Sequence, residues 1–173
     1  MLKFLFFFIT IILFNTKVLS LDLTITQGSI KPTPIAISNF FSSTDSTFRI
    51  GKNISMVISD NLERSGLFLP IDQKAFIQSS KSLAQGPRFE DWKVIKSQHL
   101  VSGKINKKGD KISVEFRLYD VFAQKELIGK KYETTEKNWR RVSHIISDAI
   151  FSRLTGDSGY FDTRIVYVAE TGP

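Results

Sequence analysis

The chain has 173 residues, of which 42% are hydrophobic and 24% charged, a composition that fits one globular domain with tails and excludes a disordered chain. It contains no cysteine, which excludes disulfides, thiolate metal sites and cysteine nucleophiles. The net charge is +7, and lysines cluster at two predicted turns, within residues 104–111 and 125–131. Basic residues at turns are typical of a solvated surface. No aromatic-basic motif indicates nucleic-acid binding.

The first twenty residues have the pattern of a secretory signal peptide. Lys3 gives a positive start, and residues 4–14 are Phe, Leu and Ile interrupted only by Thr10. This run is shorter than the roughly 20 residues that a membrane-spanning helix needs. We predict cleavage between Ser20 and Leu21, export to a bacterial periplasm, and no integral membrane segment in the mature chain. An uncleaved anchor is disfavoured because no stop-transfer pattern follows.

The mature chain begins with a strictly alternating segment. Its apolar face is Leu21, Leu23 and Ile25, and its polar face is Asp22, Thr24 and Thr26. This period predicts a half-buried strand. Gly28, Ser29 and two prolines follow and predict an extended connector up to residue 34. Such a strand either docks on its own sheet, which is the default, or adds to the sheet edge of a partner.

The first half of the predicted domain contains one long helix. Residues 35–40 predict a buried strand, 42–47 a loop, and 48–65 a helix with one apolar face that ends at Gly66. Residues 67–71 predict a short strand that Pro70 restricts to a sheet edge or a strand end. Asp72 is a candidate cap for a brief helix over residues 73–80, residues 79–87 are loop, and 89–95 predict another short helix.

The second half predicts a three-stranded meander and a helix. The strands are expected over residues 100–105, 111–120 and 127–134, and the helix over residues 138–154, before Gly156. The middle strand has an apolar face and a polar one; the polar face is Ser113, Glu115, Arg117 and Tyr119. Residues 35–156 are therefore expected to form an α/β domain of α+β type: a two-layer sandwich of a mixed, mostly antiparallel sheet with two main helices on one face.

The last residues, 157–173, contain a turn cluster and then an alternating stretch from Ile165 to Glu170 rich in β-branched and aromatic side chains. This pattern predicts a strand. A terminal edge strand of the same sheet is one interpretation, because sequential strands often pair. The other is the first strand of a second domain that is cut off.

No stretch has the pattern of an active site. His99 and His144 lack a carboxylate or second histidine at ligand spacing, and no phosphate loop or hydrolase elbow is present. We therefore predict no catalytic residue, no cofactor and no metal, and expect a binding or scaffold module. An alternative is a self-contained periplasmic domain that binds a small anionic ligand on the polar sheet face.

Four stretches, in this order, carry a resemblance to a known family. Residues 60–68 read Asp-Asn-Leu-Glu-Arg-Ser-Gly-Leu-Phe, and Trp92 precedes Leu-Val-Ser-Gly-Lys-Ile at residues 100–105. Trp-Arg-Arg-Val-Ser-His and Phe-Ser-Arg-Leu-Thr-Gly stand at residues 139–144 and 151–156, and Phe-Asp-Thr-Arg-Ile-Val-Tyr-Val at residues 161–168. Over residues 21–173 the chain resembles the TolB family of the Gram-negative Tol–Pal system, and its last stretch is similar to the start of that family's six-bladed β-propeller.

The resemblance implies a non-enzymatic adaptor that links inner-membrane TolA to the lipoprotein Pal, maintains outer-membrane integrity and supports outer-membrane invagination at cell division. Pal binding belongs to the family's propeller, so it maps to no residue here. The family's amino-terminal strand is implicated in TolA binding, and by position this role falls on Leu21, Asp22, Leu23, Thr24, Ile25, Thr26, Gln27, Gly28 and Ser29.

Overall fold

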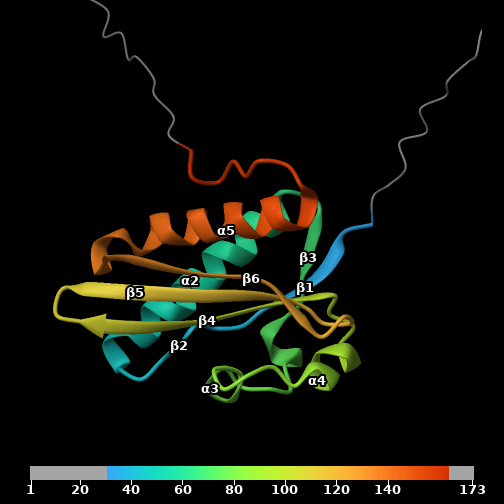
Figure 1. Cartoon of the computed structure of the whole chain (residues 1–173), viewed down its shortest axis with the longest axis horizontal. Helices are drawn as coiled ribbons and strands as arrows, with labels where there is room; N and C mark the ends of the chain where they lie inside the picture. The colour runs from blue at the N-terminus through green and yellow to red at the C-terminus, as the bar shows by residue number, and fades with distance from the viewer. Residues whose placement is uncertain (1–30, 164–173) are drawn as a thin grey trace, which may run out of the picture.

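The computed structural model describes residues 31–163 of the chain (Figure 1). Three predictions lie outside these residues: the signal peptide with its cleavage site, the amino-terminal strand over residues 21–27, and the carboxy-terminal strand that begins near Ile165.

A mixed, twisted sheet forms the centre of the described chain. Its order is β3-β1-β4-β5-β6, with the short β2 also paired to β4. The strands are β1 (Thr33–Ile37), β2 (Phe41–Ser42), β3 (Phe68–Pro70), β4 (His99–Lys108), β5 (Lys111–Asp120) and β6 (Lys125–Thr135). The three short strands pair in parallel, whereas the long β4, β5 and β6 form the antiparallel meander. The predicted mixed sheet of α+β type is confirmed.

Two long helices cover one face of this sheet (Figure 1). They are α2 (Asp45–Arg64) and α5 (Trp139–Thr155), which follows the short η2 (Glu136–Asn138). The main core lies between these helices and the sheet, and it contains Ile54, Ile58, Phe116 and Ile146, each almost fully buried. Burying such side chains stabilises the fold by about 1.5–3 kcal/mol each. The predicted pair of helices on one face is thus confirmed.

The opposite face of the sheet is partly covered. The short helices η1 (Gln73–Ala75), α3 (Ser80–Leu83) and α4 (Phe89–Val94) lie under one end of it and enclose a second core around Trp92. The alternating pattern of the meander strands predicted that this face is open to water. That prediction was wrong for Tyr119, which is 8% exposed and packs edge-on against Phe89.

Several local predictions can be compared with the structure. Asp72 accepts a hydrogen bond from the Lys74 backbone N–H, and Gly156 ends α5 with a φ of 84°, as expected. The strand predicted over residues 35–40 instead begins at Thr33. Pro34 lies beside Gln98, just before β4 begins, and its carbonyl accepts the Gln98 N–H. The N–H that proline lacks is therefore not needed for pairing with β4 at this position. The structure also contains β2 and α3, where loops were predicted.

Candidate functional site

The predicted partner-binding residues, Leu21 to Ser29, lie outside the described residues, as do Ser20 and Leu21 of the predicted cleavage site. The structure does show where the described chain begins. Lys31 and Pro32 lead into β1, and the Thr33 N–H donates to the Leu67 carbonyl at 2.9 Å. Because β3 and β4 occupy both sides of β1, this strand has no free edge.

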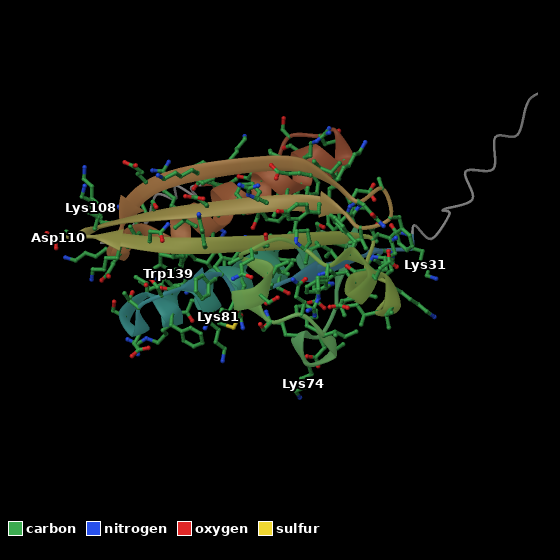
Figure 2. The ribbon with its side chains drawn as sticks, turned by 60° about the horizontal axis from the view of Figure 1, so that its bottom comes forward. Lys31, Lys74, Lys81, Lys108, Asp110 and Trp139 are labelled. Carbon is green, nitrogen blue, oxygen red and sulfur yellow. The ribbon has the colours of Figure 1, made fainter. Side chains whose placement is uncertain are left out.

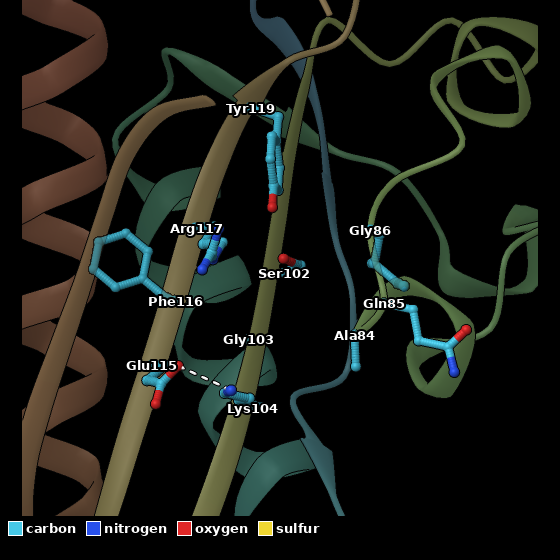
Figure 3. A pocket seen from close by; sticks show the side chains of 11 residues that line it. Ala84, Gln85, Gly86, Ser102, Gly103, Lys104, Glu115, Phe116, Arg117 and Tyr119 are labelled. Carbon is cyan, nitrogen blue, oxygen red and sulfur yellow. Dashed lines mark ion pairs between the residues drawn. The ribbon is translucent and has the colours of Figure 1, made fainter. Parts of the chain in front are cut away.

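A groove with a polar lining lies on the partly covered face of the sheet. Its volume is about 210 Å³, and it lies between the loop after α3 and the strands β4 and β5 (Figure 3). Its polar lining comes from Ser102, Lys104, Glu115, Arg117 and Tyr119. Ala84 and Gly86 form the opposite wall, whereas the Gln85 side chain points away from the sheet.

One buried amide holds that wall in place. Gln78 is 2% exposed, and its Nε2 donates to the Gly86 carbonyl at 2.8 Å. Its Oε1 accepts from the Trp92 Nε1–H at 3.0 Å and from the Arg88 N–H at 2.9 Å. Because Gln78 and Trp92 are both almost fully buried, these hydrogen bonds join the loop and Trp92 into one unit. Sequence reasoning missed Gln78, since a glutamine in a polar stretch carries no signal of burial.

The charges in the groove neutralise one another. Lys104 pairs with Glu115 at 3.2 Å, and Arg117 pairs with Glu126 at 2.9 Å. The Glu126 carboxylate raises the pKa of Arg117 above its ordinary value, with a smaller contribution from Tyr119. A small anion would have to compete with a carboxylate for each of these two cations. The groove therefore does not favour the anionic ligand considered above.

The two histidines have structural surroundings. His144 Nδ1 lies 2.9 Å from Asn61 Nδ2, and the same amide donates to the Ser147 hydroxyl at 3.0 Å, which joins α2 to α5. His99 opens β4, and burial lowers its pKa below the ordinary value, although the nearby Asp120 acts in the opposite direction. Neither histidine is paired with a carboxylate and a nucleophile in the arrangement that acid–base catalysis uses.

Neither a metal-ion site nor a membrane-spanning helix is found in the described part of the chain. Between residues 31 and 163 no group of three or more acidic or histidine side chains gathers closely enough to hold a metal ion. None of the helices there has the length and apolar character to cross a bilayer.

The lysine-bearing β4–β5 turn, with Lys108 and Asp110, projects at one end of the molecule, away from Lys31 at the other (Figure 2).

Comparison with known proteins adds to this geometry. Residues 21–127 match the model of the TolB amino-terminal domain. Over 150 residues the chain is 53% identical to the Tol-Pal system protein TolB of Paramagnetospirillum magneticum, a match that covers 86% of this chain and 34% of the relative. The chain belongs to the TolB family. It spans about a third of the length of that curated relative.

Solved structures agree with membership of the TolB family. The crystal structure of TolB from Acinetobacter baumannii superposes with a TM-score of 0.63 at 25% identity, covering 76% of this chain and 30% of that one. The lipoprotein GNA1162 from Neisseria meningitidis gives a TM-score of 0.50 at 14% identity, covering 72% of this chain and 98% of that one. The second likeness concerns the fold alone.

Proposed function

We propose that the chain is the amino-terminal part of a periplasmic adaptor of the Tol–Pal system. In this role it links a TolA-like inner-membrane protein to the lipoprotein Pal, maintains outer-membrane integrity and supports invagination at cell division. The observation that carries the proposal is the 53% identity over 150 residues to a Tol-Pal system protein. Export by the signal peptide of residues 1–20 is part of the proposal.

Within this proposal, residues 21–29 are the contact with the TolA-like partner. Their alternation suits addition to a sheet edge, where backbone hydrogen bonds give affinity and alternate side chains give specificity. In the described sheet β1 already has a neighbour on each side, so residues 21–29 are not required as its pairing partner. Pal binding is proposed for the part of the whole protein that relatives have beyond this chain.

Calorimetric titration with the carboxy-terminal domain of a TolA-like protein tests the proposal. The chain from Leu21 to Pro173 is compared with a shorter version that begins at Lys31. Lys31 is a suitable start, since a start at Pro34 would remove the Thr33 N–H that bonds to the Leu67 carbonyl in the described sheet. We expect the long version to bind and the short one not to bind. Equal binding by both would move the contact to the folded domain.

Two substitutions sharpen this test. Ile25→Asp places a charge on the apolar face of residues 21–27, whereas Thr24→Asp places the same charge on the polar face. The expected result is that Ile25→Asp weakens binding at least tenfold and Thr24→Asp does so much less, because only the first charge would be buried against the partner. Equal losses would contradict the assignment of faces, and no binding by any version would contradict the adaptor role.

A further inference from the structure

After α5 the chain turns back on itself. Gly156 adopts a left-handed backbone with a φ of 84°, and its N–H donates to the Ser152 carbonyl at 3.0 Å. Residues 156–163, which we call the strap, then run along α5 towards its amino-terminal end (Figure 1). The described chain therefore ends beside the first half of α5, far from the point near Lys31 where it begins.

Asp148 of α5 holds the strap by its backbone. Its carboxylate accepts the Phe161 N–H at 2.7 Å and the Asp162 N–H at 3.0 Å. Hydrogen bonds to a charged acceptor are about twice as strong as neutral ones. One turn further along α5, the Ser152 hydroxyl accepts the Gly159 N–H at 3.0 Å. Two helix side chains thus satisfy three strap amides.

The packing of the strap is equally close. A Cβ on Gly159 would lie 2.5 Å from both Cα and Cβ of Asp148, so only glycine fits where the strap crosses the helix. The rings of Tyr160 and Phe161 meet the buried Phe151 ring edge-on, with centroids 5.4 and 5.8 Å apart. The exposed pair between Arg141 and Asp162 at 3.4 Å adds little.

We propose that the strap is a rigid segment held in place by Asp148. The strap thereby fixes the direction in which the chain leaves the domain at Thr163. A free linker of this length would let its end wander over roughly 15 Å. The strap instead holds Thr163 at one place beside α5. Asp148 is a positioning residue in this role, and the role holds whichever partner binds residues 21–29.

The absence of cysteine from the natural sequence makes a distance measurement direct. Spin labels are placed on the full chain at two exposed positions, through Lys74→Cys on η1 and Thr163→Cys at the end of the strap. Pulsed electron paramagnetic resonance then gives the distribution of distances between the two spin labels. We expect a narrow distribution in this background and a broad one when Asp148→Ala is added. Asp60→Ala, which removes an exposed carboxylate from α2, is the control and should leave the distribution narrow.

Amide hydrogen exchange separates release of the strap from general unfolding. In Asp148→Ala the amides of Phe161 and Asp162 should exchange roughly 10- to 100-fold faster, while those of the central strand β5 keep their protection. Gly159→Ala disrupts the contact between the strap and Asp148 without changing the sequence of α5, and it should speed the same amides. This variant therefore tests the proposal if Asp148→Ala fails to fold. Unchanged exchange at Phe161 and Asp162, or an equal loss of protection in β5, would overturn the proposal.

Discussion

Replacing Gln78 by alanine is the sharpest test of how the groove wall is held. The substitution removes the acceptor for Trp92 Nε1–H and Arg88 N–H, and the donor to the Gly86 carbonyl. Trp92 is 1% exposed, so its N–H is left without a partner in a site closed to water. An unsatisfied buried group costs about 1–3 kcal/mol. Adding the loss of packing, we expect the free energy of unfolding to fall by roughly 2–4 kcal/mol.

Urea unfolding followed by circular dichroism and tryptophan fluorescence measures this loss. In a thermal melt it corresponds to a decrease of roughly 6–12 °C, at about 3 °C per kcal/mol for a domain of this size. Gln85→Ala is the matched control, because Gln85 is exposed on the same loop and its side chain points away from the sheet. Its effect should stay within about 0.5 kcal/mol.

A double-mutant cycle with Trp92→Phe isolates the bond itself. Phenylalanine has no N–H to satisfy, so the added cost of Gln78→Ala should be smaller in that background, with a coupling of about 0.5–3 kcal/mol. Additive effects of the two substitutions would refute the Gln78–Trp92 bond as a stabilising contact. A loss in Gln78→Ala no greater than that in Gln85→Ala would refute the role of Gln78 in holding the wall.

Two further predictions concern the sheet. Gly103→Ala should destabilise the domain by about 1–3 kcal/mol in urea unfolding, because the new methyl group overlaps the buried ring of Phe40. At Gly129 a new methyl group would be crowded by the exposed Glu126 carboxylate, which can move, so a loss from Gly129→Ala as large as that from Gly103→Ala would contradict the explanation. His99 should titrate below 6.5 by NMR, since burial lowers its pKa. The unfolded chain then binds more protons around that pH, so the free energy of unfolding should decrease from pH 7.5 to about 5, and His99→Gln should flatten this dependence; an unchanged slope would contradict it.

The sequence predicted those elements whose pattern is local. Strict alternation placed β5 at residues 111–120, as observed, and the apolar stripes of α2 and α5 gave two helices for one sheet face. Pro70 correctly restricted β3, which is an edge strand, and Gly156 marked the end of α5. Each of these signals depends on the residue's own backbone preferences or on a period within one element, so no partner had to be known.

The groove and the strap could not be predicted, because both depend on contacts between distant parts of the chain. β2 has only two residues and is defined by its pairing with Lys104 and Ile105, and α3 has only four and is followed by the loop that Gln78 anchors. Such short segments have too little intrinsic preference to be recognised alone. The cover over Tyr119 was missed for the same reason, since alternation shows which residues share a face but not what lies on it.

The sequence by itself therefore determined the mixed sheet, its two long helices and the family to which the chain belongs. Tertiary structure alone decided that the second face carries a groove with paired charges, and that Asp148 holds the strap against α5. The physical reason is one of range. Periodicity and capping act within a few residues, whereas a buried amide or a carboxylate that satisfies remote N–H groups acquires its role only when folding brings its partners to it.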